Sequence, residues 1–269
     1  MASGAEGHGE ESGSLDILGH IINHHELHLG PFRIPLPHLE LFGIDMSISV
    51  HLVMMWIAAL FLIVTLTVST KRRGMVPSGF ANAIEALVVF IRDDLALPNI
   101  GKHDAPRFIP YLLTAFLFIL TCNLLGLIPF AATATSNINV TATLAACSFV
   151  AMVGGGIQHN GLFGYFRGLI PHGLPLWLLP IMIPLEFLGL FTKPFALAVR
   201  LFANMTAGHV VILSLLGLIF VLKTLLIAPV SVLFALAIYM LEIFVAFVQA
   251  YVFTLLSAVF IGMAIHQEH

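Results

Sequence analysis

Apolar residues run along this chain in long blocks, which is the pattern of helices that cross a membrane. The first block covers residues 46–70 and is followed at once by Lys71-Arg72-Arg73. A basic cluster directly after an apolar block marks the cytoplasmic end of a span, so the amino terminus is predicted to lie outside. Residues 1–45 are expected to form an extramembrane segment, with a short surface helix over 14–29.

Three further elements follow before the final third of the chain. Residues 76–95 carry Phe80, Ile84 and Leu87 on one side and are interrupted by charges, which predicts an amphipathic helix along the cytoplasmic interface. Residues 108–129 and 138–156 are expected to form a hairpin of two spans. The second of these ends in a run of three glycines and is expected to lead into a cytoplasmic loop.

The last two blocks, 174–222 and 225–266, are longer than a bilayer requires. Residues 230–261 contain neither proline nor glycine, and as one helix they would be ~48 Å long. The hydrocarbon core is only ~30 Å thick. We therefore expect a strongly tilted hairpin of two helices that reverses near 223–229. The fold class is an all-α polytopic membrane protein with about five spans, a membrane domain over 46–269 and a cytoplasmic carboxyl terminus.

Composition excludes the other broad classes. Of the 269 residues, 59% are hydrophobic and 9% are charged, whereas about a quarter of the residues of a soluble domain are charged. The chain is also too apolar to be disordered. Its net charge of -3 gives no sign of nucleic-acid binding. A phosphate-binding loop of the GxxxxGK[ST] type is absent, so any nucleotide chemistry belongs to other chains.

The few charges inside the apolar blocks are therefore candidates for function. Glu186, Lys193 and Arg200 are seven residues apart, so they share one stripe of a continuous helix, and Asn204 lies one turn further. Arg200 has no partner among its sequence neighbours, and arginine does not lose its proton. Small residues between positions 196 and 208 would let a second helix approach. This pattern predicts either close packing within the chain or a groove for a partner helix that brings the missing anion.

Two pairs of polar residues predict how the last two helices face each other. In an antiparallel hairpin, Arg200 opposite Gln249 and His209 opposite Glu242 both place the reversal near residue 225. Gln249 is then expected to hold the Arg200 side chain by a hydrogen bond. Each of these side chains could instead be a hydrogen-bonded or snorkelling residue without a role in function.

Three segments resemble subunit a of rotary ATP synthases. Residues 193–209 (KPFALAVRLFANMTAGH) are similar to that family's arginine motif, and residues 247–256 (FVQAYVFTLL) and 184–189 (PLEFLG) are similar to two further signatures. The resemblance implies that Arg200 faces a ring of c subunits with lipid-exposed carboxylates. It implies further that five residues line proton paths or the rotor interface: Glu186, Asn204, His209, Glu242 and Gln249.

The resemblance also implies the wider setting. Such a chain is a stator subunit without a catalytic site or cofactor of its own. It conducts protons through two offset half-channels and so couples the proton-motive force to rotation and ATP synthesis. The implied partners are the c ring, b-type peripheral-stalk subunits, other ATP synthase subunits and the lipid bilayer, in a bacterial inner membrane. Proton and sodium remain alternatives, because the partner's carboxylate holds the ion.

Other functions are open at this stage. A secondary transporter is one, although such proteins show internal repeats that this chain lacks. Haem ligation by His51 and His209 is another. Histidines near the amino terminus have a helical spacing that suits a divalent ion: His20, His24, His25 and His28.

Overall fold

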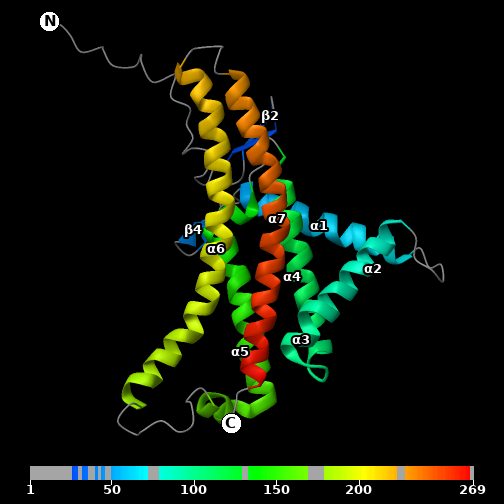
Figure 1. Ribbon diagram of the computed structural model, residues 1–269, viewed down its shortest axis with the longest axis vertical. Coiled ribbons are helices and arrows are strands. Elements are labelled where there is room, and N and C mark those ends of the chain that lie inside the picture. Colours follow the sequence, from blue (N-terminus) through cyan, green and yellow to red (C-terminus); the bar gives the residue numbers. More distant parts are fainter. Residues whose placement is uncertain are drawn as a thin grey trace, which may run out of the picture.

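The computed structural model describes residues 26–29, 32–35, 40–41, 44–45, 50–71, 79–128, 133–168, 179–222 and 228–266. From Val50 onward, every regular element in these ranges is a helix (Figure 1). Within this described part, five helices are long and apolar enough to cross a membrane, which confirms the predicted fold class. They are α1 (Val50–Lys71), α4 (Ala105–Gly126), α5 (Ile138–Gly168), α6 (Leu179–Leu222) and α7 (Ala228–Ile265).

Two small hairpins precede α1. Strand β1 (Glu26–Leu29) pairs antiparallel with β2 (Phe32–Pro35), and β3 (Glu40–Leu41) pairs with β4 (Ile44–Asp45). The predicted surface helix over 14–29 is therefore wrong for its last four residues, and its first twelve lie outside the described residues. In the sequence, Gly30-Pro31 is a pair typical of turns, and the prediction of a helix overlooked this signal.

Between α1 and α4, the chain forms α2 (Phe80–Phe90), the π-helical turn η1 (Ile91–Ala96) and α3 (Leu97–Ile100). One side of this stretch is buried against the other helices. On the other side, Arg92 Nε and Nη2 donate to the two carboxyl oxygens of Asp93, at 2.7 and 3.0 Å. These exposed hydrogen bonds hold the pKa of the Asp93 carboxyl below its usual value. The stretch is thus amphipathic, as expected of an interfacial helix.

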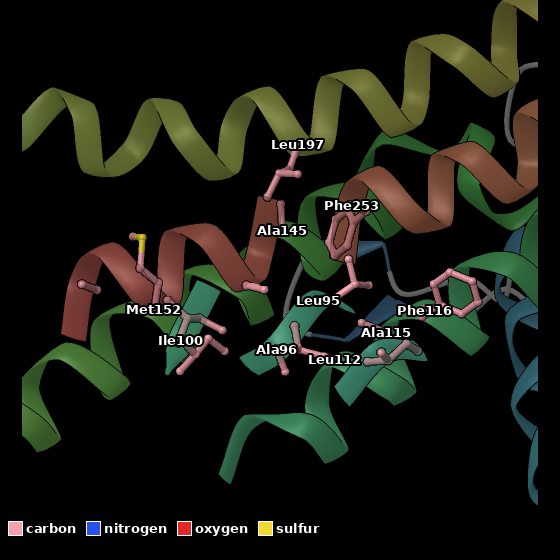
Figure 2. Packing of buried hydrophobic residues seen from close by; sticks show 14 of the residues in the cluster. Leu95, Ala96, Ile100, Leu112, Ala115, Phe116, Ala145, Met152, Leu197 and Phe253 are labelled. Atoms are coloured by element: carbon pink, nitrogen blue, oxygen red, sulfur yellow. The ribbon is translucent and has the colours of Figure 1, made fainter. Parts of the chain in front are cut away.

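The largest buried cluster joins this interfacial stretch to α4, α5, α6 and α7. The cluster includes Leu95 from η1, Leu112 from α4, Met152 from α5, Leu197 from α6 and Phe253 from α7 (Figure 2). Apolar contact on this scale between helices that also face lipid fixes how they pack. The core therefore holds the second half of α7 against the interfacial stretch.

Helix α5 continues past its glycine run to a kink at Gly161 (φ 72°, ψ 164°), and a second helical segment follows to Gly168. Two of the three glycines serve close packing. A Cβ at Gly155 would lie 2.8 Å from the Phe108 ring, and one at Gly156 would lie 2.9 Å from the Ala264 carbonyl of α7. Since neighbouring helices fill this space, the run marks a contact surface and not the end of a helix.

Helices α6 and α7 form the predicted long hairpin. They contain 44 and 38 residues, and the reversal falls between Leu222 and Ala228. Helix α7 alone is ~57 Å long at the rise of an α-helix. In Figure 1, α1 runs across the long direction of α6 and α7. Both helices are longer than the ~30 Å hydrocarbon core, and their oblique course through a bilayer stays a prediction.

Candidate functional site

An ionisable pair lies between α6 and α7. Glu242 of α7 is only 3% exposed, and its Oε1 is 3.9 Å from Nε2 of His209 on α6. Among the described residues, neither carboxyl oxygen of Glu242 has a hydrogen-bond partner. An ionised carboxylate in such a place is costly unless a cation lies beside it. The pair is therefore suited to holding and passing on a proton.

Gly208 makes room for this carboxyl group. A Cβ at position 208 would lie 2.5 Å from Oε1 of Glu242 and 2.9 Å from its Cδ. Any larger residue would push the carboxyl group away from α6. The glycine next to His209 thus decides how close the acid can lie to the imidazole.

Two residues that sequence reasoning did not assign to the site extend the pair. The hydroxyl of Thr133 hydrogen-bonds to Nε2 of His209, and the Thr133 carbonyl is 3.0 Å from Nδ1 of His51. Both Thr133 and His51 are buried. His51 lies in the first turn of α1, and Thr133 lies just before the short turn η2 (Ala134–Ser136). Polar groups therefore continue from Glu242 to the beginning of α1.

Gln249 pairs with Asn204. Asn204 Nδ2 donates to Gln249 Oε1 at 3.0 Å, and Gln249 is 3% exposed. The predicted hydrogen bond from Gln249 to Arg200 does not appear among the described contacts. The pairing is displaced by one helical turn, because the amide of Asn204 faces α7 whereas Arg200 points outward.

Arg200 is exposed on α6, and so are the apolar residues Phe195 and Val199. The neighbouring residues Leu197 and Leu201 are buried. Within the part of the chain that the structure describes, Arg200 has no hydrogen-bond or ion-pair partner. A permanent cation thus stands on an apolar outer face of the hairpin.

The other two members of the predicted stripe differ from Arg200. Glu186 is partly exposed. The ammonium group of Lys193 lies 5.7 Å from the centre of the Phe260 ring on α7, a cation–π contact. Lys193 is thus held within the chain by this contact.

The described residues contain no group of three or more His, Cys, Asp or Glu side chains that could hold a metal ion. Three of the amino-terminal histidines lie outside the described residues: His20, His24 and His25. For His28, the structure describes only the backbone, which is part of β1. The two candidate haem ligands, His51 and His209, both contact Thr133.

These features define a multi-pass membrane protein with ionisable groups inside its long helices, the class that includes ion-conducting subunits. The family model of the ATP synthase A chain matches residues 52–262. The chain belongs to the ATP synthase subunit a family.

Several relatives named ATP synthase subunit a are similar over most of their length. The protein from Chloroherpeton thalassium is 57% identical over 263 residues, which cover 95% of this chain and 78% of the relative. That from Chlorobium phaeobacteroides (strain DSM 266) is 51% identical over 274 residues, 98% of this chain and 79% of the relative. The protein from Myxococcus xanthus is 56% identical over 229 residues, which cover 84% of this chain and 75% of the relative. The resemblance found in the sequence is confirmed.

Proposed function

We propose that this chain is a stator subunit that carries protons to and from the carboxylates of a c-subunit ring through two offset half-channels. The single observation that supports it most is Arg200, an exposed cation on an apolar helix face with no acidic partner among the described residues. A charge in that position is costly unless an anion comes beside it. A rotor carboxylate supplies that anion.

Arg200 then drives the release of the proton. A permanent cation favours the ionised form of a nearby carboxylate. A protonated rotor carboxylate that arrives from lipid gives up its proton beside Arg200, into the half-channel open to the cytoplasm. Beyond Arg200 it takes a proton from the outer half-channel and re-enters lipid as a neutral acid. The guanidinium also blocks a direct path between the two half-channels.

The outer half-channel is assigned to Glu242 and His209, with Thr133 and His51 as its continuation. The contacts among these four residues lead from the α6–α7 interface to the first turn of α1. The basic cluster after the opposite end of α1 favours an outer position for that first turn. A proton that enters near His51 therefore meets polar groups on its way to Glu242.

The inner half-channel is assigned to Glu186, ~21 Å from Arg200 along α6 at the rise of an α-helix. The hydrogen bond between Asn204 and Gln249 fixes α6 against α7 one turn from Arg200. The membrane potential supplies ~2.3 kcal/mol per charge per 100 mV and biases rotation of the ring. Peripheral-stalk and other ATP synthase subunits complete the assembly, in an inner membrane with the amino terminus outside.

Arg200→Ala tests this function. We expect it to abolish ATP synthesis driven by an imposed pH gradient and to leave a passive proton leak through the membrane sector, measured with a pH-sensitive dye. Lys193→Ala is the matched control. It also removes a cation from α6, but one that already contacts the Phe260 ring within the chain. It should keep synthesis. A proton-tight Arg200→Ala complex that still makes ATP contradicts the proposal.

A further inference from the structure

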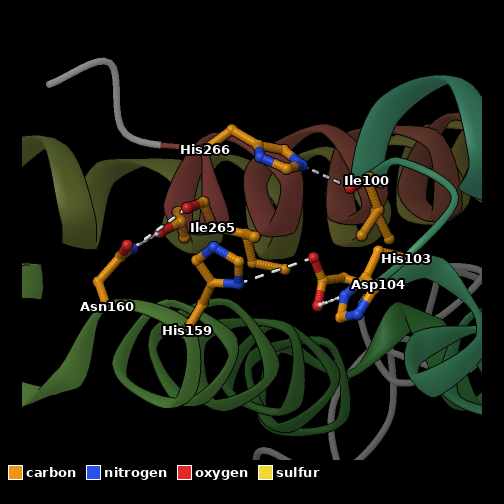
Figure 3. Close-up of polar contacts among 8 residues, drawn as sticks. Ile100, His103, Asp104, His159, Asn160, Ile265 and His266 are labelled. Carbon is orange, nitrogen blue, oxygen red and sulfur yellow. Dashed lines mark hydrogen bonds and ion pairs between the residues drawn. The ribbon is translucent and has the colours of Figure 1, made fainter.

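A second group of titratable side chains lies at the end of the molecule where α7 ends (Figure 3). It surrounds an open pocket of about 250 Å³ between the start of α4 and α5. Asp104 contacts two histidines of this group. Its Oδ1 is 3.3 Å from Nδ1 of His103, and its Oδ2 is 3.7 Å from Nδ1 of His159. None of these residues belongs to the site between α6 and α7.

Groups from every element packed here face the cluster. Arg107 of α4 lines the same pocket and is the one permanent cation among its described lining residues, as Asp104 is the one carboxylate. The ring of His266, at the end of α7, faces that of His159 with 6.1 Å between centres. His266 Nε2 is 2.7 Å from the Ile100 carbonyl, so this third histidine ties α7 to α3.

Exposure falls in steps from solvent into the pocket. The side chain of His103 is 95% exposed, that of His159 is 44% exposed and that of Asp104 is 20% exposed. The pocket has room for several water molecules beside them. The two imidazoles therefore lie nearer to solvent than the carboxylate, and imidazole is a common proton carrier in proteins.

This pocket lies level with Glu186. Phe149 of α5 stacks on Phe191 of the antiparallel α6, with 5.3 Å between ring centres. Because the two helices run in opposite directions, Glu186, five residues before Phe191, is level with Gly154, five residues after Phe149. The residue after Gly154 is Gly155, which lines the pocket. Figure 1 places the start of α6 and the end of α7 at the same end of the molecule.

We propose that His103, Asp104 and His159 form a proton-exchange site at the cytoplasmic mouth, which passes protons between the inner half-channel and the cytoplasm. The inference rests on the proposed function. During synthesis, a ring nitrogen of His159 takes a proton from pocket water and gives it back to water or buffer at the mouth. Asp104 holds the imidazolium in place, and the proton is the only particle transferred.

A His103→Gln/His159→Gln double variant tests the site in the complete complex in liposomes, with passive proton conduction measured after removal of the soluble sector. In dilute buffer on the cytoplasmic side, conduction should fall about tenfold, the lower end of the gain that a focusing charged entry gives. Concentrated imidazole buffer on that side should restore it, because mobile buffer replaces the fixed one. Lys102→Gln, in the same loop but outside the pocket lining, should conduct normally in both buffers.

Each other outcome overturns the site. Equal conduction by the double variant and the parent in dilute buffer shows that the histidines carry no protons. A loss that concentrated buffer does not restore shows a structural role only, and ATP hydrolysis by the intact complex monitors assembly. Restoration by buffer on the outer side alone places the mouth on the wrong face. If the parent complex itself conducts no protons, the proposed function fails, independently of these variants.

Discussion

Glu242 holds its place because a neighbouring residue lacks a side chain. Gly208 leaves the space into which the Glu242 carboxyl fits, beside Nε2 of His209. Forcing extra volume into such a contact costs about 1–3 kcal/mol. The acid can relieve this cost by turning away from His209, so a single methyl group controls the geometry of the pair.

Gly208→Ala should therefore slow passive proton conduction, because the Glu242 carboxyl group moves away from His209. Gly189→Ala is the matched control on the same helix, since a Cβ there would meet nothing within 4 Å. Conduction is measured in vesicles stripped of the soluble sector. If both variants conduct alike, the close contact at Gly208 has no part in the path.

Glu242→Gln keeps the shape of the side chain but removes its capacity to take a proton. Proton uptake from the outer side should fall roughly a hundredfold, the lower range for a positioned acid–base group. Glu85→Gln makes the same change on the exposed side of α2 and should leave uptake unaffected. Unchanged flux in the Glu242 variant removes this residue from the path.

At the scale of the elements, the end of α7 is held by backbone contacts to α3. A Cβ at Gly262 would overlap the carbonyl oxygen of Asn99, and Asn160 Nδ2 donates to the Ala264 and Ile265 carbonyls at 3.3 and 3.2 Å. Backbone atoms cannot move aside as the tip of a side chain can. The interfacial stretch thus fixes where α7 ends.

Gly262→Ala should destabilise the purified complex by at least the ~1–3 kcal/mol of an overpacked core, measured as a lower midpoint of thermal unfolding of this subunit. Gly154→Ala introduces the same methyl group on α5, where nothing lies within 4 Å. It should be neutral or slightly stabilising, because alanine favours helix. Equal midpoints for the two variants would show that the contact at Asn99 does not limit stability.

The whole molecule leaves broad apolar faces of α1, α6 and α7 exposed, and Arg200 lies on one of them. Lipid can cover the apolar residues, but only an acidic partner can balance the charge of Arg200. The need for an external acidic partner distinguishes the proposed stator subunit from a secondary transporter, which completes its own ion path.

The purified chain alone in liposomes should therefore conduct no protons above the lipid background, and conduction should appear when a c ring is reconstituted with it. The measurement is dye quenching under an imposed potassium diffusion potential. Arg200→Ala with the ring serves as the leaky control. Ion flux by the chain alone, saturable and independent of the ring, would favour a transporter.

Much of the element scale could be predicted from hydropathy. The blocks that became α1, α4, α6 and α7 were found because a span needs a minimum apolar length. The face-to-face position of His209 and Glu242 followed from a single reversal between two continuous helices. The glycine run of α5 was misjudged, because a contact with Phe108 and α7 looks like a break when only the local sequence is considered.

Hydropathy and the positions of the charges along the chain were enough to show that this is a membrane protein, how many long helices it has and which charges lie inside them. The reason is that bilayer thickness and the cost of a buried charge act on each segment separately. Only the tertiary structure decided that Thr133 and His51 meet His209, that Gly208 admits Glu242, and that His103, Asp104 and His159 share a pocket. Those contacts join segments that are far apart in the sequence. They depend on the positions and angles at which the helices cross, which no local sequence pattern encodes.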